Sequence, residues 1–569
     1  MRRLSLVGVV LALAAGCLRT ASGGCGGPAV GEPCRCTDRL GSRAALPPGT
    51  GLVDAETAPR GGTAVVHVEV EPPHLLPLLR PDAWCERIVL HDVYEALVRR
   101  DPFPPHDIVP ELAESFDVSP DGLELVFHLR RDVRWHDGRP FTSDDVMFTF
   151  DTIRDPAVMA AAARAHFETV ERYDAPDPAT FRMTLREPSF LMLQHLESTT
   201  IIPRHVFGHG DINTHSHIRQ PIGTGPFRFV GYRAGREVVL ERNDEYWGPP
   251  ARLDRIVYRF ARDRALAMQM LRRGDVDVLP RLTPAQFEQV ASDTDLLGTH
   301  ELVNMLAPGF SFIVYNTRRA QFRDARVRQA LTMLIDRETI LCALEECLGE
   351  VVSGPFPVGH PGNDPAIEPW PFDPTRARRL LDEAGWRQER PGDVRRRAGN
   401  PLRFTLLIPA VSTNQHRMAT LIQQDLLRAG IRVDLHSLDW SAFMERVTEH
   451  DFDAATLMFS TDWETDYFDL YHSSQCQGGQ NYGCWENAEA DDLLVELRRE
   501  LDPGRRVQLE RRLHQILHDE QPITFMLARV VTSLSSRSIR NARPGIPWYD
   551  ERRWFIPPAD RGDGGRPRR

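Results

Sequence analysis

Apolar and polar positions alternate along most of the chain in the manner of short strands and helices. Residues Thr63–Val70 alternate with the period of two that a half-buried strand requires. Residues Arg264–Arg273 are instead predicted as a helix, because Gly274 follows and glycine commonly ends helices. Further along, Phe452–Phe459 is an apolar run of the length of a buried strand. Helices that alternate with short apolar strands predict an α/β fold.

Further helices are predicted where a capping residue precedes a stretch or a glycine follows it. Thr142 or Ser143 caps one helix whose first turn carries Asp144 and Asp145, acids that suit the positive end of the helix dipole. A turn is predicted at Ser119–Gly122. The other predicted elements are helices at Glu86–Arg99, Asp324–Leu341, 374–384 and Asn414–Ala429, and strands at 123–129, Phe310–Asn316 and 431–438.

Acidic and aromatic residues follow the apolar run Phe452–Phe459. In open α/β sheets, ligands bind on the loops beyond the carboxyl ends of the strands. An acidic and aromatic loop at that place suits a ligand with one cationic end and an apolar or extended body. The alternative is a solvated acidic loop with half-buried rings. The residues concerned are Asp462, Trp463, Glu464, Asp466, Tyr467, Phe468, Asp469 and Tyr471.

The size and charge of the chain exclude several classes of function. Its 569 residues are enough for two or three domains, and 41% hydrophobic and 26% charged residues are typical of a soluble globular protein. A net charge of −11 argues against a nucleic-acid partner, which needs a basic surface. The sequence contains no lysine, so it contains no phosphate-binding P-loop either.

The first residues form a targeting segment. Arg2 and Arg3 precede the apolar stretch Leu4–Ala15, and a small-residue cleavage site leads to Cys17. A cysteine at this place is similar to a bacterial lipobox, although Ala14 stands where that motif most often has leucine. We therefore expect an exported protein, lipidated at Cys17 and anchored to a bacterial membrane at the periplasmic or cell-surface side. The alternative is an ordinary secretory signal, cleaved nearby with loss of Cys17.

Eight further cysteines are candidates for disulfide bonds, since exported proteins meet an oxidising environment. Cys476 and Cys484 flank a glycine-rich loop and are predicted to form a disulfide across it. Cys342 and Cys347 stand on a predicted helix, so a bond between them requires the helix to end between them. No metal site is predicted, because no second pair follows Cys34–Cys36 at a usable spacing.

Six separate motifs in one order resemble the extracellular solute-binding proteins, family 5, of dipeptide, oligopeptide and nickel ABC importers. The resemblance covers roughly residues 61–550. The motifs are ELAESFDVSPDGLELVFHLRRDVRWHDGRPFTSDDVMFTF (111–150), PIGTGPFRFV (221–230), LERNDEYWGPP (240–250), RDARVRQALTMLIDR (323–337), FDPTRARRLLDEAGW (372–386) and the segment 440–494.

The resemblance implies a periplasmic-binding-protein-like type II fold, in which two lobes joined by a hinge close on a ligand and an extra domain elaborates the first lobe. The expected divisions are a lipoprotein-type signal peptide (1–17), a flexible tether (18–60), a first lobe (61–98, 216–315 and 526–556), an extra domain (99–215), a second lobe (316–525) and a disordered tail (557–569).

The resemblance also implies a ligand site. In peptide-binding members an aspartate at the position of Asp462 pairs with the α-ammonium of the peptide, and a tryptophan at the position of Trp440 lines a side-chain pocket. By the same alignment Trp84 lies on a first-lobe strand that faces the ligand. Phe459, another expected pocket residue, stands where peptide binders often have tryptophan, and Thr456 stands where some members have an arginine for the peptide carboxylate.

Together these features predict a monomeric receptor, not an enzyme and without a cofactor, that delivers peptides to a membrane ABC permease. The alternative ligands are a nickel chelate, haem or an oligosaccharide. An exported hydrolase would need a catalytic motif such as GxSxG or HExxH, and neither is present in the sequence. The histidine-rich stretch His205–His217 is interpreted as a solvated loop.

Overall fold

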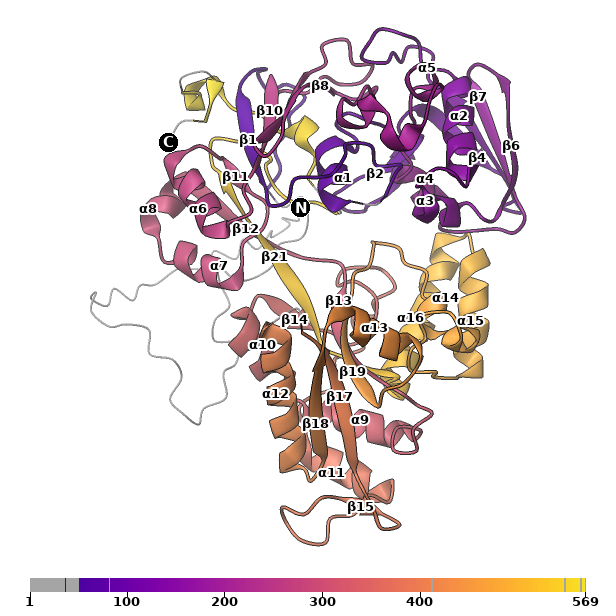
Figure 1. Ribbon diagram of the computed structural model, residues 1–569, viewed down its shortest axis with the longest axis vertical. Coiled ribbons are helices and arrows are strands. Elements are labelled where there is room, and N and C mark those ends of the chain that lie inside the picture. The colour runs from indigo at the N-terminus through magenta and orange to yellow at the C-terminus, as the bar shows by residue number, and fades with distance from the viewer. Residues whose placement is uncertain are drawn as a thin grey trace, which may run out of the picture.

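The computed structural model shows two lobes that the long strand β21 (Leu527–Ser536) connects (Figure 1). The structure describes residues 36, 51–80, 82–410, 413–546, 549–562 and 565–567. The predicted targeting segment, with Cys17, lies outside these residues, as does most of the predicted tether. Among the described residues, no helix is both long enough and apolar enough to span a membrane.

The first lobe is built on an eight-stranded mixed sheet with the order β12-β21-β11-β1-β10-β9-β8, in which β14 adds to β21. The alternation predicted at Thr63–Val70 corresponds to β1, which pairs in parallel with β10 and β11 and is buried along most of its length. The elements of the first lobe are β1 (Thr63–Val68), β8 (Phe227–Arg233), β9 (Glu237–Arg242), β10 (Arg255–Phe260), β11 (Val278–Leu279), β12 (His300–Leu306), β14 (Gly349–Val351), α6 (Arg264–Arg273), α7 (Pro284–Ala291) and α8 (Thr294–Thr299).

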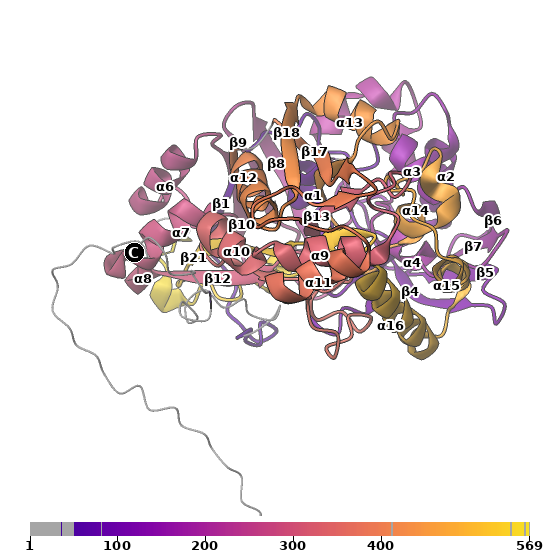
Figure 2. The ribbon, with the colours of Figure 1, turned by 90° about the horizontal axis from the view of Figure 1, so that it is seen from below.

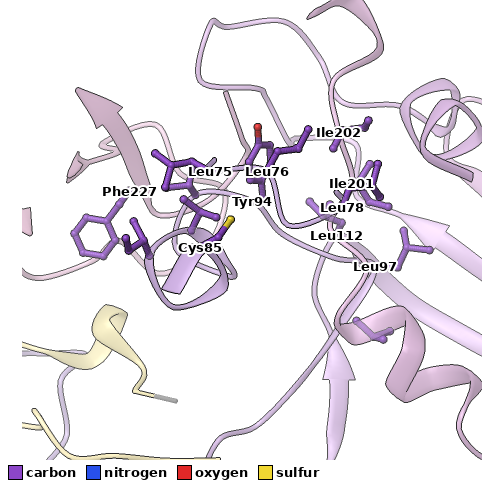
Figure 3. Close-up of a cluster of buried hydrophobic side chains, with 14 of the residues drawn as sticks. Leu75, Leu76, Leu78, Cys85, Tyr94, Leu97, Leu112, Ile201, Ile202 and Phe227 are labelled. Carbon is purple, nitrogen blue, oxygen red and sulfur yellow. The ribbon is translucent and has the colours of Figure 1, made fainter. Parts of the chain in front are cut away.

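A short helix, α1 (Ala83–Val89), replaces the longer helix predicted from Glu86 to Arg99. It begins where it does because the Asp82 carboxylate caps it, accepting hydrogen bonds from the backbone N–H groups of Trp84 and Cys85. It ends at Leu90, which is extended. Its buried Cys85 lies beside Leu75 and Tyr94 in the first-lobe core (Figure 3). Trp84 is therefore on a helix and not on the expected strand.

The extra domain is a four-stranded antiparallel sheet, β4-β5-β7-β6, with helices beside it. The predicted turn at Ser119–Gly122 closes through a 2.8 Å hydrogen bond between its end residues. Helix α2 begins at Ser143 with a capping box between Thr142 and Asp145. The elements are β2 (Val98–Arg100), β3 (Ile108–Pro110), β4 (Ala113–Val118), β5 (Glu124–Leu129), β6 (Val170–Asp177), β7 (Thr180–Leu185), α2 (Ser143–Arg154), α3 (Ala161–His166), α4 (Met192–Glu197) and α5 (Arg204–Phe207).

The second lobe is built on a five-stranded sheet, β18-β17-β19-β13-β20, covered by helices. The predicted helix Asp324–Leu341 is two helices, because Asp336 caps the second one. Viewed from below, α9 and α11 lie side by side (Figure 2). The elements are β13 (Phe310–Tyr315), β15 (Arg396–Arg397), β16 (Asn400–Pro401), β17 (Arg403–Pro409), β18 (Arg432–Leu438), β19 (Ala454–Phe459), β20 (Ile523–Phe525), α9 (Ala325–Leu334), α10 (Arg337–Glu345), α11 (Pro374–Glu383), α12 (Thr413–Arg428), α13 (Trp440–Thr448), α14 (Phe468–Tyr471), α15 (Ala488–Arg499) and α16 (Pro503–Glu520).

The chain changes lobes earlier than the expected boundary at residue 315. Strand β13 pairs with β19 and β20, so it belongs to the second-lobe sheet, whereas β12 pairs with β21 in the first. The crossing is therefore at 307–309, where Gly309 has a φ of +119°. A second crossing lies at Met526, between β20 and β21. The first crossing therefore lies on the amino-terminal side of the expected boundary.

The described parts of the predicted tether and tail are held by specific contacts. Cys36 forms a disulfide bond with Cys347, next to α10. Asn541 accepts a hydrogen bond from the Val53 backbone N–H and donates one to the Val53 oxygen. Near the carboxyl end, Arg566 forms an ion pair of 2.9 Å with Asp277. The described residues of 557–567 thus differ from the predicted disordered tail, because arginines that the sequence places there find acidic and backbone partners in the first lobe.

Candidate functional site

Asp462 lies where the second lobe meets both the first lobe and the extra domain. It follows β19 by three residues, as the position of the acidic loop in the sequence predicts. Its Oδ2 is 3.5 Å from Nε2 of Gln194, on α4 of the extra domain. Solvent reaches the side chain, yet the loss of hydration at this junction raises the pKa of Asp462, while the charges of Arg100 and His166 act in the opposite direction.

The first lobe contributes a second acidic group that interacts with Asp462. Glu86 is half-buried on α1, and desolvation, followed by the negative charges of Asp82 and Asp462, raises the pKa of Glu86 to about 6. Asp82 is the residue that caps α1. The negative charges of Asp82 and Asp462, which belong to different lobes, therefore both act on Glu86, and a cationic group close to Glu86 would relieve this repulsion.

Apolar side chains stand at the edge of the second-lobe sheet from which the Asp462 loop departs. Strands β18, β17 and β19 run parallel, so their carboxyl ends meet at one edge. Phe459 ends β19 and lies against Phe310, with ring centroids 6.2 Å apart. Trp440 begins α13 just after β18 and is 51% exposed. Met458, which the sequence did not single out, is 53% exposed at the same edge. Exposed apolar residues of this kind can contact the body of a ligand.

Trp84, another expected pocket residue, is half-buried against the first-lobe core, two residues from Glu86 on α1. Thr456, which the sequence marks as a departure from the family pattern, is fully buried within β19. The disulfide predicted between Cys476 and Cys484, which follow the Asp462 loop in the sequence, is present.

Contacts between the extra domain and the second lobe surround the Asp462 loop. Gln194 Nε2 donates a hydrogen bond of 2.8 Å to the backbone oxygen of Glu464. The Glu464 carboxylate also pairs with Arg100 at 3.4 Å and with Arg506 at 3.0 Å. Trp463 packs on His106, with ring centroids 4.3 Å apart. Sequence reasoning missed Arg100, Gln194 and Arg506, because isolated polar residues carry no motif.

The described residues contain two groups that resemble metal sites, and cysteines in both are disulfide-bonded. They are Cys36, Cys342 and Cys347, and His450, Cys476 and Cys484. In the histidine-rich stretch, His205 pairs with Asp137 at 2.7 Å and His215 packs on His217. The arrangement near Asp462 is thus a junction of carboxyl groups and apolar surfaces from two lobes, with no nucleophile–base pair among the residues discussed.

Comparison with known proteins gives similar folds and sequences along most of the chain. The chain is 30% identical over 472 residues to Di/tripeptide-binding protein 2 of Pseudomonas aeruginosa, covering 76% of this chain and 83% of that protein. It is similar to the oligopeptide-binding protein AppA of Bacillus subtilis in complex with a nonapeptide (25% identity, TM-score 0.66, 88% of this chain and 100% of that one). NikZ of Campylobacter jejuni in complex with Ni(L-His) shares the fold (21% identity, TM-score 0.68, 88% of this chain and 100% of that one).

The family model for bacterial extracellular solute-binding proteins, family 5 Middle, matches residues 107–481, which is more than half of the chain. This stretch includes most of the extra domain and the second-lobe residues Asp462, Trp440 and Phe459. The match agrees with the two-lobe α/β architecture and with the resemblance of the six sequence motifs. The chain belongs to the bacterial extracellular solute-binding proteins of family 5.

Proposed function

We propose that this protein is an extracytoplasmic receptor that binds peptides between its lobes and delivers them to a membrane ABC permease. The observation that carries the proposal is the position of Asp462 at the junction of the two lobes and the extra domain. Two of the similar proteins are named as binders of peptides. In this chain the α-ammonium of the peptide would pair with Asp462.

The chemistry of the junction supports a ligand with a positive end. An ammonium group loses its hydration when lobes close over it, and this cost is recovered when a carboxylate pairs with it. Asp462 supplies that carboxylate, and Glu86 adds negative charge from the opposite lobe. Trp440, Phe459 and Met458 offer apolar surface for the rest of the ligand, and Trp84 supports the helix that carries Glu86.

We further propose that the receptor is a monomer held at the membrane by a lipid on Cys17. The sequence around Cys17 supports this anchoring. The disulfide between Cys36 and Cys347 would then attach the anchored end of the chain to the second lobe rather than to the first-lobe strand β1. Mass spectrometry of the membrane fraction tests the anchor, because an acylated amino-terminal Cys17 is heavier than an unmodified one by the mass of its fatty acids.

The sharpest test of the binding mechanism compares free-amine peptides with their N-acetylated forms. Asp462→Ala is expected to weaken the binding of free-amine peptides by about 2–3 kcal/mol and to change the binding of acetylated peptides little, since only the free-amine peptides carry the positive charge. Isothermal titration calorimetry measures both. Asp451→Ala is the matched control, because Asp451 is an exposed second-lobe aspartate paired with Arg446. Equal losses for both kinds of peptide would remove the ammonium role of Asp462.

Native mass spectrometry of the purified protein identifies the cargo class. A retained mass that fragments into amino acids supports the peptide assignment. A retained metal chelate, haem or oligosaccharide would assign the receptor to another solute and leave the fold and family unchanged.

A further inference from the structure

A cavity of about 390 Å³ lies where the extra domain meets the second lobe. One wall comes from the extra domain and includes Phe190, Met192 and Leu193, and the facing wall comes from α16. Asp462 does not line this cavity, although its neighbours Trp463 and Glu464 do. A volume of this size accommodates a small organic molecule.

The cavity contains a buried carboxylate oxygen without a hydrogen-bond donor. Glu510, on α16, is 7% exposed, and its Oε2 has no hydrogen-bond partner among the described residues. The closest cationic or imidazole groups are Arg506 Nε, 3.9 Å from Oε1, and His360 Nδ1, 3.9 Å from Oε2, and both lie beyond hydrogen-bond distance. A buried acceptor left unsatisfied costs about 1–3 kcal/mol, so a ligand that donates a hydrogen bond there gains that energy.

The charges around the cavity favour a cationic donor. Arg100 forms ion pairs with Glu197 at 3.2 Å and with Glu464 at 3.4 Å, and Arg506 pairs with Glu464 at 3.0 Å. These two guanidinium groups are matched by two carboxylates, and Glu510 is the buried acid that remains. Asp107, the other acid of the lining, is exposed to solvent. A single positive charge brought to Glu510 therefore balances the buried part of this set.

The rest of the lining is largely apolar. Leu125, Leu193 and Val507 contribute aliphatic surface, and Phe190 presents a ring on which the Arg506 guanidinium lies, 5.4 Å from the ring centroid. We propose that this cavity binds a small amphipathic monocation whose ammonium group donates to Glu510 Oε2 and whose apolar body rests on Phe190, Leu193 and Val507. Because the walls belong to two parts of the protein, the occupant favours the arrangement in which they meet.

The test uses n-hexylammonium as the probe at about pH 8, where Glu510, with a pKa of about 7, is ionised. The protein is the full chain carrying Asp462→Ala, so that the ligand site between the lobes does not capture the cation. Isothermal titration calorimetry is expected to detect binding below about 10 mM, a range that a ligand of this size reaches in a fitting site. The isosteric neutral probe 1-hexanol is expected to bind about tenfold more weakly, because it lacks the charge that strengthens the hydrogen bond to Glu510.

Two variants locate the probe. Glu510→Gln removes the charge and keeps the shape of the side chain, and it is expected to weaken the binding of n-hexylammonium about tenfold. Val507→Trp fills the cavity and is expected to abolish binding. Glu496→Gln is the matched control, because Glu496 is exposed on α15 and pairs with Arg505. Circular dichroism checks each fold, and Val507→Trp decides the result if Glu510→Gln does not fold. The proposal is overturned if the probe does not bind to the Asp462→Ala chain, or if it binds to either cavity variant as well as it binds to that chain.

Discussion

Gln194 Nε2 donates a hydrogen bond of 2.8 Å to the backbone oxygen of Glu464, two residues beyond Asp462. The same amide lies 3.5 Å from the Asp462 carboxylate. Gln194 belongs to the extra domain and Asp462 to the second lobe, so one side chain joins the two at the candidate ammonium site. The extra domain therefore contacts the second lobe at this site and is not only an addition to the first lobe.

Gln194→Ala is expected to weaken peptide binding by about 1 kcal/mol, because the variant loses one hydrogen bond that holds the Asp462 loop in the closed arrangement. Titration calorimetry measures the affinity, and small-angle X-ray scattering of the ligand-bound protein is expected to show a larger radius of gyration. Gln289→Ala on the exposed face of α7 serves as the control. Unchanged affinity in Gln194→Ala would assign the closing role to Arg100 and Glu464 alone.

Peptide binding is expected to weaken as the pH falls. The raised pKa of Asp462 means that this carboxylate takes up a proton at a higher pH than an exposed aspartate does, and a protonated Asp462 no longer pairs with an ammonium group. Affinity is therefore full above the pKa of Asp462 and is lost below it. Three groups face it: Glu86, whose pKa is about 6, Arg100 and His166.

The measurement is the dissociation constant of one free-amine peptide from about pH 8 to about pH 4, a range that spans ordinary and raised carboxyl pKa values. Asp462→Asn is expected to bind weakly at every pH and to flatten the profile. Glu86→Gln separates the two acids, since any fall that remains in this variant belongs to Asp462. An affinity that stays constant down to about pH 4 would contradict the prediction.

The sequence predicted those features that depend on local pattern. The α/β class, the strand before Asp462 and the position of Asp462 beyond its carboxyl end all follow from hydrophobic runs and motif order. The family alignment predicts a strand at Trp84, and this prediction is wrong, because the Asp82 cap starts the short helix α1 there. Gln194 could not be found, because its partner Glu464 is 270 residues away in the chain and only the fold brings them together.

The boundary between the lobes shows the same limit. Strand β13 looks like any other apolar strand, and its lobe is decided by pairing with β19, more than a hundred residues later. The feature that marks the crossing is Gly309, whose positive φ no other residue adopts easily. A glycine within a strand-like run gives this signal only weakly, since glycines also occur in turns and bulges.

Gly309→Ala is expected to disturb the crossing between the lobes. A Cβ at this position would clash with the backbone oxygen of Phe459, and the φ of +119° is strained for any side chain, so we expect a destabilisation of about 1–3 kcal/mol. Because Phe459 leads to the Asp462 loop, peptide affinity is expected to fall as well. Denaturant unfolding and calorimetry measure the two effects. Gly298→Ala, where a Cβ meets no atom within 4 Å, is the control, and equal behaviour of the two variants would remove the special role of Gly309.

Glu510→Gln is expected to change how stability depends on pH. Burial raises the pKa of Glu510 to about 7, so the native state binds this proton more tightly than the unfolded state does. The contribution of Glu510 to the free energy of unfolding is fully present below the ordinary glutamate pKa, and it is lost as the pH rises through about 7. With one pKa unit worth about 1.4 kcal/mol, the loss amounts to about 3 kcal/mol.

The other buried acid of this network, Glu197, also has a pKa raised to about 7 by burial, whereas the pKa of His514 is lowered to about 4. The wild-type curve therefore sums several groups, and the difference between variant and wild type isolates Glu510. Denaturant unfolding measures the free energy of unfolding of both proteins. Between about pH 5 and pH 8, the free energy of unfolding of Glu510→Gln is expected to rise relative to that of the wild type by about 3 kcal/mol. Glu496→Gln, on the surface, is expected to show no such shift. Parallel curves for Glu510→Gln and wild type would mean that the Glu510 carboxyl group is hydrated in solution, and the cavity ligand would then gain nothing from pairing with it.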